Sequence, residues 1–436
     1  MIEKPPKTSN EEKVKAIFRL LTEDGLAEVV QEQNANYAYW TDVKYKHDGF
    51  NSAEELWALV KASRQVGSVM RLPQFGLHAL ITSEMNKMCR DLDLHYGDTW
   101  VTDIRMSQRS QSLHLVSSVM EEAIWSSQME GASTTRRVAM EMLASKKKPK
   151  GRSETMIANN FAAINFIMDN KANPLTKDLI LHLHSTMTSG TLDKPEYEGR
   201  FRDNDDVVVA NGITDEIVHI PPKCEKIEGL IDALCNFINN DNPAVYIHPA
   251  IKAIVAHFVM SYVHPFIDGN GRTARAIFYW CMLKDNYWLL QYLSISGEIA
   301  RSKRLYEKAF LQSEADGGDI GYFIMYHLRV IRNAFARLQD SLKREEANRI
   351  ATEKAVRTGL NDRQANILGK MQSGEFLAIT ARDVESLLNV SHTTARADLD
   401  GLAKLGLLEK VQVNKVKSRY ILPTDSTPSP PLDPQN

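Results

Sequence analysis

The sequence predicts a mainly α-helical protein with a helical core, one β-hairpin and a small C-terminal domain of three helices and a second hairpin. Three observations predict this class. Apolar residues recur every three or four positions along most of the chain, which is the period of a helix with one buried face. Runs of β-branched residues flank the pair Asn211-Gly212, which is typical of a hairpin. After residue 360, three short helical patterns precede two strand-like runs.

Length and charge limit the classes of function. The chain has 436 residues, which is enough for two or three domains with a large core. Its 53 Lys and Arg residues and 55 Asp and Glu residues give a formal charge of −2. This balance argues against a protein whose overall charge attracts it to nucleic acid or membranes, although a local basic patch is still possible. The four cysteines lack C-x-x-C spacing, so we expect neither a disulfide framework nor a zinc site.

No segment has the features of a secretory signal or a membrane span. Residues 1–10 are polar and lack an apolar stretch. The longest apolar run, 251–263, is interrupted by Lys252 and His257 and is too short to cross a bilayer. We therefore expect a cytoplasmic protein without a membrane partner.

The N-terminal region, residues 1–110, is expected to be helical and irregular. Val14, Ile17, Phe18 and Leu21 recur at helical spacing, and an aromatic cluster follows them. A small packing subdomain explains these features, so we assign no chemistry to this region.

A strong helical pattern runs from residue 113 to residue 143. Ser126 and Glu130 are four positions apart and lie on one helix face. Gly131 is a typical residue for the end of a helix. Taken alone, these residues describe an ordinary helix end with a solvated Glu130.

Two features lie between this helix and residue 264. His182 and His184 have no carboxylate partner at metal-ligand spacing, so we interpret both as structural. Residues 206–220 carry the hairpin signal, which a plain surface hairpin would explain.

The stretch 264–275 concentrates the chemistry of the chain. It reads His-Pro-Phe-Ile-Asp-Gly-Asn-Gly-Arg-Thr-Ala-Arg and lies between two apolar helical segments. Gly269 and Gly271 can adopt positive φ and let backbone N–H groups converge on an anion. We expect the next helix to begin near Arg272, so its positive dipole end faces the same point. Arg272 and Arg275 share one face of its first turn and suit phosphate oxygens.

Asp268 and His264 add a cation ligand and a base to this stretch. A carboxylate beside a polyphosphate suits Mg²⁺, and an imidazole titrates near neutral pH. A Gly-Asn-Gly sequence alone is usually a turn, but the whole set matches the pattern H-x-F-x-D/E-G-N-G-R-x-x-R without a mismatch. The chain therefore resembles the Fic family of nucleotidyl transferases.

The resemblance implies a reaction and a role for each residue of the motif. Fic proteins usually move AMP from ATP to a protein hydroxyl and release pyrophosphate. By this resemblance, His264 would deprotonate the target hydroxyl and Asp268 would hold Mg²⁺. The backbone of Gly269 and Gly271, together with Asn270, would cradle the α- and β-phosphates. Arg272 and Arg275 would bind the outer phosphates.

The same resemblance gives a meaning to three further features. Ser126 and Glu130 are similar to the family's inhibitory helix, S/T-x-x-x-E-G/N, which falls near 116–131, with Met129 where isoleucine is usual. The hairpin at 206–220 corresponds to the flap that lines the target site. Tyr306 is our candidate for contact with the nucleotide base, although core packing explains it almost as well.

The C-terminal part is expected to be a separate module. Residues 336–359 form a charged helical linker, and residues 360–422 resemble a winged helix-turn-helix. Residues 423–436 are proline-rich and expected to be disordered. Such modules bind DNA or proteins, and the candidate DNA contacts are Thr393, Thr394, Arg396, Lys415, Lys417 and Arg419.

Together these features predict a catalytic domain over 111–335 that transfers AMP from Mg²⁺-ATP to a Ser, Thr or Tyr hydroxyl of a target protein, or of the chain itself, restrained by Glu130. Three alternatives stay open: another nucleotide or phosphocholine as the donor, AMP removal with Glu130 aligning a water, and a DNA-binding regulator whose core senses a nucleotide. The complete motif argues against the last, because binding alone would not require His264. The sequence does not identify the target protein, and a homo-oligomer stays possible.

Overall fold

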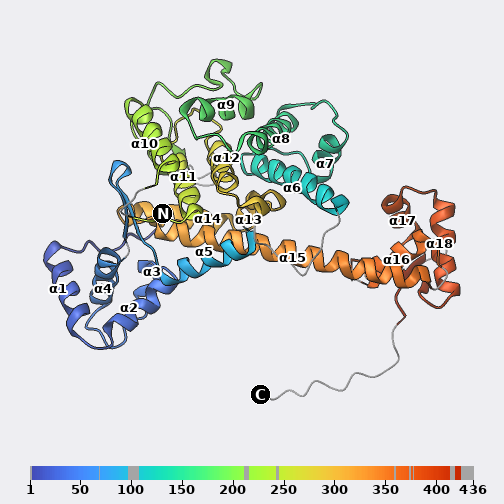
Figure 1. The fold of residues 1–436 in the computed structure, drawn as a ribbon, viewed down its shortest axis with the longest axis horizontal. Coiled ribbons are helices and arrows are strands. Elements are labelled where there is room, and N and C mark those ends of the chain that lie inside the picture. Colours follow the sequence, from blue (N-terminus) through green and yellow to red (C-terminus); the bar gives the residue numbers. More distant parts are fainter. Residues whose placement is uncertain are drawn as a thin grey trace. The chain divides into compact units, whose positions relative to one another are not determined.

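The computed structural model describes residues 2–67, 69–96, 108–210, 216–241, 245–357, 360–372, 375–376, 378–412 and 418–423. The chain divides into two compact units, Met1–Ala336 and Arg337–Asn436. Both are mainly helical, with short antiparallel strand pairs, so the predicted fold class is confirmed in these respects (Figure 1).

The N-terminal part of the first unit combines five helices with a hairpin. These elements are α1 (Asn10–Thr22), α2 (Leu26–Ala35), α3 (Trp40–Val43), α4 (Ala53–Val66), β1 (Val69–Leu72), β2 (Leu77–Leu80) and α5 (Ser83–Tyr96). A capping box starts α1, because the Ser9 hydroxyl accepts from the Glu12 N–H while the Glu12 carboxylate accepts from the Ser9 N–H. β1 and β2 have no clear sequence signal and were not predicted, since each is four residues long and they contain a single β-branched residue, Val69.

A buried ion network joins this part to the turn between α14 (Lys303–Ala315) and α15 (Gly321–Arg357). Lys61 Nζ on α4 lies 2.8 Å from Asp316 Oδ2 and 2.9 Å from Asp319 Oδ2. Arg64, also on α4, is fully buried and lies 3.6 Å from Asp319. Burial raises the pKa of Asp319, but Lys61 and Arg64 outweigh it and lower the pKa to about 2. Loss of one partner would leave an unpaired buried charge.

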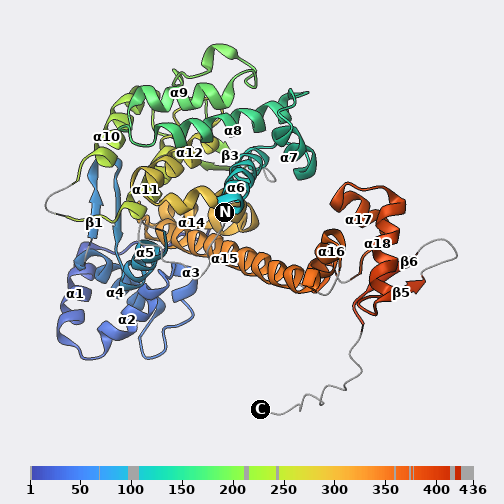
Figure 2. The ribbon, with the colours of Figure 1, turned by 45° about the vertical axis from the view of Figure 1, so that its right-hand side comes forward.

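Two helices form the centre of the first unit. α11 (Pro249–Val263) and α12 (Asn270–Lys284) are buried on nearly all faces, and the first turns of α12 bury the side chains of Arg272 and Arg275 as well. α12 also packs against α6, α8 and α9 (Figures 1 and 2). The surrounding helices are α6 (Gln108–Met129), α7 (Arg136–Ala144), α8 (Arg152–Asn170), α9 (Lys177–Thr188), α10 (Ile227–Asn239) and α13 (Ile295–Arg301).

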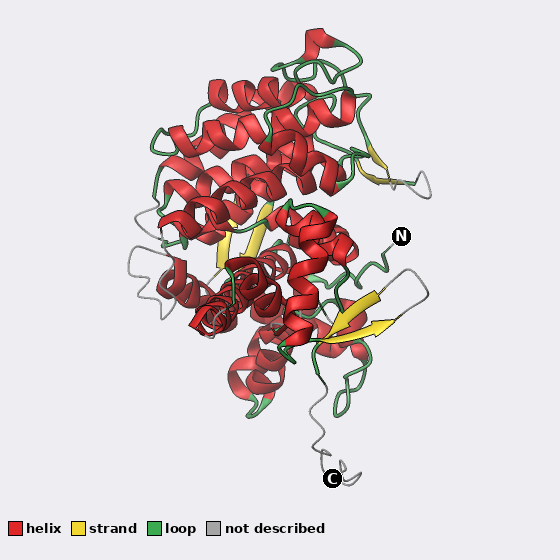
Figure 3. Ribbon diagram, turned by 90° about the vertical axis from the view of Figure 1, so that its right-hand side faces the viewer, coloured by secondary structure: helices red, strands yellow, loops and turns green. Residues whose placement is uncertain are grey.

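The hairpin expected at 206–220 is present as a short antiparallel pair, β3 (Val209–Ala210) and β4 (Ile217–His219) (Figure 3). Val209 lies opposite His219. Residues 211–215, including the Asn-Gly pair, lie outside the described residues.

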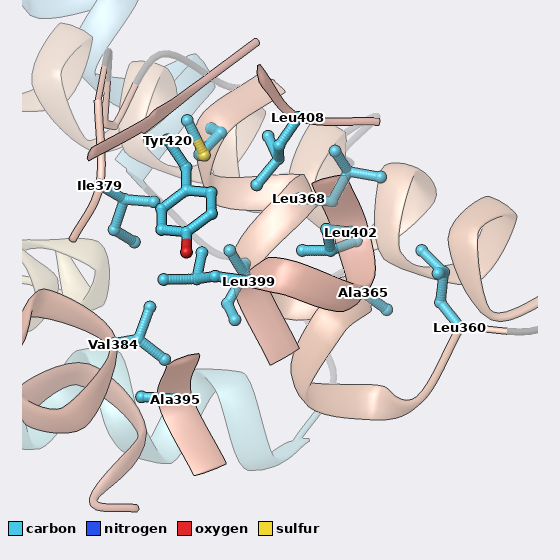
Figure 4. Packing of buried hydrophobic residues seen from close by; sticks show 12 residues of the cluster. Leu360, Ala365, Leu368, Ile379, Val384, Ala395, Leu399, Leu402, Leu408 and Tyr420 are labelled. Atoms are coloured by element: carbon cyan, nitrogen blue, oxygen red, sulfur yellow. The ribbon is translucent and has the colours of Figure 1, made fainter. Parts of the chain in front are cut away.

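The second unit has its own apolar core. Its elements are α16 (Asp362–Gln372), α17 (Ala381–Leu388), α18 (His392–Lys404), β5 (Glu409–Gln412) and β6 (Ser418–Ile421). Leu368, Leu399 and Tyr420 meet in this core (Figure 4). An isolated bridge between Ile379 and Tyr420 ties the segment before α17 to the hairpin. Asn389 ends α17 with φ of 52°, a left-handed conformation that asparagine tolerates.

Within the described ranges, no helix has both the length and the apolar composition required to cross a membrane.

Candidate active site

The loop between α11 and α12 turns sharply at His264. This residue ends α11 with φ of 47°, a left-handed conformation that is uncommon outside glycine. Its backbone N–H still donates to the Met260 carbonyl. A backbone conformation of this kind persists where surrounding contacts hold it, and such residues cluster at functional sites.

The ring of His264 is set up to accept a proton. Nδ1 lies 3.3 Å from the Ser261 carbonyl oxygen, which can only accept, so Nδ1 carries the hydrogen and Nε2 keeps its lone pair. Burial, the largest influence, lowers the pKa of His264 to about 4. The imidazole is therefore neutral near neutral pH.

The Asn270 side chain closes the loop. Its Oδ1 accepts from the Phe266 N–H at 2.9 Å, and its Nδ2 donates to the Phe266 carbonyl at 2.8 Å. The predicted phosphate contact would therefore come from the backbone at the start of α12 rather than from this buried amide. α12 begins at Asn270, two residues earlier than expected, with Gly269 as its N-cap.

The two glycines of the loop have different structural roles. Gly269 has φ of 81°, as predicted, and a Cβ there would lie 2.8 Å from Thr188 Cγ2. The expectation of positive φ at Gly271 is wrong, because this residue lies inside α12. Gly271 is needed for space instead, since a Cβ there would overlap the carboxylate of Glu130.

Arg275 joins α12 to the end of α6. Its Nε lies 3.0 Å from Ser126 Oγ, and its Nη2 lies 2.8 Å from the Ser126 carbonyl oxygen. The same Nη2 lies 3.0 Å from Glu130 Oε1. The arginine side chain is 5% exposed and that of Glu130 27%. Glu130 is therefore half-buried and ion-paired rather than the solvated helix end that the residues alone suggest.

Arg272 is buried beneath the loop. Its Nη1 donates to the Met187 carbonyl at 3.0 Å, and Nη2 lies 3.8 Å from Asp268 Oδ1. Its side chain is 1% exposed, and desolvation lowers the pKa of the guanidinium. Among the described residues, its Nε has no hydrogen-bond partner. A buried donor of this kind fits an anion or a water at the site.

Asp268 is the candidate metal ligand. One of its oxygens accepts from the Gly269 N–H, and its side chain is 45% exposed. The described part of the chain contains no cluster of three or more His, Cys, Asp or Glu side chains that could hold a metal ion. A lone exposed carboxylate fits Mg²⁺, which is usually held by one or two carboxylates, substrate phosphates and water.

His184 supports the loop from α9. Its ring stacks on Phe266 with centroids 3.6 Å apart, and its Nε2 lies 2.9 Å from the Asp268 carbonyl oxygen. Nδ1 accepts from the Gly199 N–H at 3.0 Å. These contacts fit the structural interpretation of His184. Its contact with the 264–275 loop could not be predicted, because the loop is distant in sequence and no sequence pattern connects the two.

Arg202 is a second support that the sequence analysis did not identify. Its N–H donates to the Pro265 carbonyl at 2.9 Å, and its Nε donates to the His264 carbonyl at 3.0 Å. Backbone and guanidinium of this one residue thus hold two consecutive carbonyls at the turn.

A cavity of about 420 Å³ opens beside this loop. This volume lies within the usual range for a small-molecule site. The Tyr306 hydroxyl lies 3.4 Å from His257 Nε2. Six residues named in the sequence analysis line this cavity: Met129, Glu130, His264, Gly271, Arg275 and Tyr306.

The candidate DNA contacts of the second unit divide by exposure. Thr393, Arg396 and Arg419 are exposed, and Thr394 is half-buried. Arg396 Nε lies 3.8 Å from Asp400 on the same helix. Lys415 and Lys417 lie outside the described residues.

Fold and loop together define a helical domain with a turn suited to anions. The Fic/DOC family model matches residues 174–282, which include this loop. Protein adenylyltransferase Fic of Nematostella vectensis is 26% identical over 166 residues, which cover 38% of this chain and 34% of the relative. Protein adenylyltransferase Fic of Drosophila melanogaster is 32% identical over 124 residues, which cover 28% of this chain and 23% of the relative. The chain therefore spans about a third or less of the length of these curated relatives.

A solved structure agrees in fold. A variant of Fic-1 from C. elegans gives a TM-score of 0.50 at 18% sequence identity, covering 76% of this chain and 87% of that one. Residues 174–282 of this chain form a Fic domain. The curated relatives that share it are named protein adenylyltransferases.

Proposed function

We propose that this chain transfers AMP from ATP to a hydroxyl side chain of a protein, and that Glu130 restrains the reaction. The observation that carries the proposal is the ion pair between Glu130 and Arg275 in the cavity that His264 also lines. It brings an imidazole with a free lone pair, a guanidinium and a displaceable carboxylate to one space. The names of the curated relatives support the activity.

His264 acts as the general base. Its Nε2 accepts the proton of the incoming hydroxyl as that oxygen attacks the α-phosphorus of ATP. The bond from the α-phosphorus to the bridging oxygen breaks, AMP stays on the attacking oxygen, and pyrophosphate leaves. A base with a pKa lowered to about 4 is unprotonated at neutral pH and so is ready for this role.

The start of α12 binds the phosphates. Its first N–H groups and its dipole favour an anion beside Gly269. Arg275 reaches the outer phosphates once it is free of Glu130. The Nε of Arg272, which has no hydrogen-bond partner within the described part of the chain, is available as a further donor. Asp268 would hold Mg²⁺, which would neutralise phosphate charge in the bound complex.

Glu130 restrains transfer by occupying Arg275. Its carboxylate lies where the γ-phosphate would pair with the guanidinium, and one negative group excludes another. ATP would then bind with its outer phosphates displaced and its α-phosphorus out of line with the target hydroxyl. A misplacement of about 1 Å at a reacting centre costs roughly 10²-fold in rate.

The hairpin docks the target. Val209, Ala210 and Val218 line the same cavity as His264. An extended target segment added to the edge of this strand pair would use main-chain hydrogen bonds and would bring a hydroxyl toward the base.

Labelled nucleotides test the proposal. The full chain, with Mg²⁺ and α-labelled ATP, GTP, CTP or UTP, is followed for incorporation into itself and into an added His264→Ala copy. Glu130→Gly should raise incorporation from ATP by at least the roughly 10²-fold cost of misalignment. Glu130→Gly combined with Arg275→Ala should lose that gain. Glu121→Ala, which removes another carboxylate of α6, is the matched control and should change little.

The sign of the Glu130 effect separates the proposal from AMP removal. If Glu130→Gly lowers the only detectable activity, and that activity is release of AMP from a modified protein, then Glu130 is a catalytic residue that aligns a water. If another nucleotide is incorporated and ATP is not, the donor assigned to the chain is wrong, whereas the mechanism stays as proposed.

The second unit is proposed to be a winged helix, residues 360–422, that binds DNA, joined to the catalytic domain through 336–359. Three helices followed by a hairpin support this assignment. A module that contacts proteins, including a second copy of the chain, is the competing role.

A further inference from the structure

A second histidine lies at the wall of the active-site cavity. His219 is the last residue of β4 and lines the cavity together with His264. Its side chain is 4% exposed. The ring contacts Tyr262 of α11 and Glu314 of α14. One side chain therefore joins the hairpin to the helix that carries the base and to the helix that carries Tyr306.

Both nitrogens of the His219 ring face acceptors. Nε2 lies 2.7 Å from the Tyr262 carbonyl oxygen, and Nδ1 is paired with the carboxylate of Glu314. The Tyr262 carbonyl oxygen can only accept a hydrogen bond, so Nε2 donates to it. Nδ1 is engaged by the carboxyl group of Glu314, so neither ring nitrogen is left for a target hydroxyl. His264, whose Nε2 keeps its lone pair, stays the base.

The contacts of His219 fix the distance between the hairpin and the end of α11 that carries His264. Tyr262 is two residues before His264, so the Nε2 bond is made at the end of α11 that positions the base. Val209 of β3 lies opposite His219 and lines the same cavity. The rings of Tyr262 and Phe310 lie 5.2 Å and 5.9 Å from the imidazole and limit its movement.

We propose that His219 is a positioning residue, whose two ring nitrogens fix β4 to α11 and α14 and thereby set the distance between a target chain on the hairpin and His264. The inference rests on the proposed function, because it needs a hydroxyl-bearing target at the hairpin. It goes further by naming the side chain that couples the target wall of the cavity to the base.

A pair of glutamine substitutions tests the two hydrogen bonds. His219→Gln can donate to the Tyr262 carbonyl, but it then turns its own carbonyl oxygen toward the Glu314 carboxylate, which repels it. Glu314→Gln alone keeps an amide oxygen for Nδ1–H and serves as the matched control. The double variant, His219→Gln with Glu314→Gln, restores both bonds, because the amide introduced on α14 can donate to the amide oxygen introduced on β4.

The kinetic readout is AMP transfer in the Glu130→Gly background, with labelled ATP as donor and the full-length His264→Ala chain as acceptor. His219→Gln should raise the KM for the acceptor about tenfold, which is the scale of one unsatisfied buried polar group. The KM for ATP should stay the same. The double variant should return to within about threefold of the parent, as expected for coupled neighbours.

Hydrogen exchange separates failure of this inference from failure of the proposed function. Amides at 209–210 and 217–219 should exchange faster in His219→Gln and recover in the double variant, while those of α12 stay protected. Unchanged exchange and unchanged acceptor KM would overturn the inference. An equal rise in both KM values, without rescue, would make His219 a general packing residue. If Glu130→Gly transfers no nucleotide, the proposed function fails, and exchange alone then decides whether His219 anchors the hairpin.

Discussion

His264 and His184 both have pKa values lowered to about 4 by burial, but their neighbours leave them different chemistry. His184 donates from Nε2 to the Asp268 carbonyl and accepts at Nδ1 from Gly199, so both ring nitrogens are used. His264 uses Nδ1 for Ser261 and keeps the Nε2 lone pair. The same residue type thus supports the loop in one place and is free to take a proton in the other.

The pH dependence of transfer tests the role of His264. Because the neutral imidazole is the active form, transfer by the Glu130→Gly chain should stay constant as pH falls through 6.5, the ordinary histidine pKa, and should decline only as pH approaches about 4.

His264→Ala should lower transfer by roughly 10²–10⁴-fold. ATP affinity should be kept, as measured by calorimetry. His182→Ala, at an exposed histidine, is the control.

Two outcomes would contradict this account of His264. Half-maximal transfer at the ordinary histidine value would mean that burial does not control the base. Unchanged transfer in His264→Ala would remove the base assignment altogether.

Gly271 shows where local sequence stops being informative. The pattern predicted a positive φ at both glycines, which holds for Gly269, whereas Gly271 is helical. Its lack of a side chain makes room for Glu130, which comes from another helix far away in the chain. A local pattern can name the residue, but it cannot report a neighbour that only the fold supplies.

At the scale of elements, α6 is held at several points besides Arg275. The buried carboxylate of Glu122 accepts from the Ser296 N–H at 2.8 Å and from the Ser294 hydroxyl at 3.2 Å, both at the start of α13. Burial raises the pKa of Glu122. On α8, Asn160 Nδ2 lies 3.3 Å from Ser127 Oγ. The restraining carboxylate therefore sits on a helix whose docking has its own anchors.

Weakening one anchor should release part of the restraint. Glu122→Ala leaves the Ser296 N–H without its buried partner, which costs stability in the docked position of α6. Transfer should rise about threefold to tenfold in the otherwise unchanged chain. It should not rise in the Glu130→Gly background, where no restraint is left to release. An equal fall in both backgrounds, measured with labelled ATP, would mean that Glu122 supports the catalytic core instead.

Helices were easier to predict than strands in this chain. α17 (Ala381–Leu388) is one of the three short helices expected after residue 360, and its start is well marked because Thr380 and Asp383 form a capping box there. The strands of the first unit are two to four residues long, which is too short for a clear alternation. The β3–β4 pair was found through its Asn-Gly turn signal, and β1–β2 had no such signal.

At the scale of the whole molecule, several basic side chains of the second unit lie beside carboxylates. Arg363 is paired with Asp398 at 2.7 Å, and Lys410 is paired with Asp400 at 2.7 Å. Arg396 lies 3.8 Å from Asp400. The predicted DNA contacts that can be tested on described residues are therefore Arg396 and Arg419, both of which are exposed.

Gel shifts with a random-sequence duplex test this binding. Affinity should fall roughly 10-fold or more between about 50 mM and about 200 mM salt, because each phosphate contact releases counterions. Arg396→Ala and Arg419→Ala should each weaken binding and reduce the salt slope, whereas Arg363→Ala, at a paired arginine, should not. Absence of any shift at low salt would assign the unit to protein contacts.

The buried histidines predict how stability of the first unit depends on pH. Burial lowers the pKa values of His184 and His264 to about 4 and that of His327 to about 3, from an ordinary value of 6.5. Between these limits the unfolded chain binds more protons than the folded one, so the free energy of unfolding falls as pH falls. Each group should cost about 2 kcal/mol by a pH of about 5.

Urea unfolding followed by tryptophan fluorescence measures this effect, because all six tryptophans belong to the first unit. The loss of unfolding free energy between neutral pH and a pH of about 5 should be smaller in His327→Phe by about 2 kcal/mol, since one buried site can no longer take up a proton. His182→Ala, at an exposed histidine, should leave the loss unchanged. The same urea midpoint at both pH values in the parent chain would mean that these histidines take up protons equally well in the folded and the unfolded chain. The pKa values of the buried histidines would then not be lowered, and the neutral state assigned to His264 would be wrong.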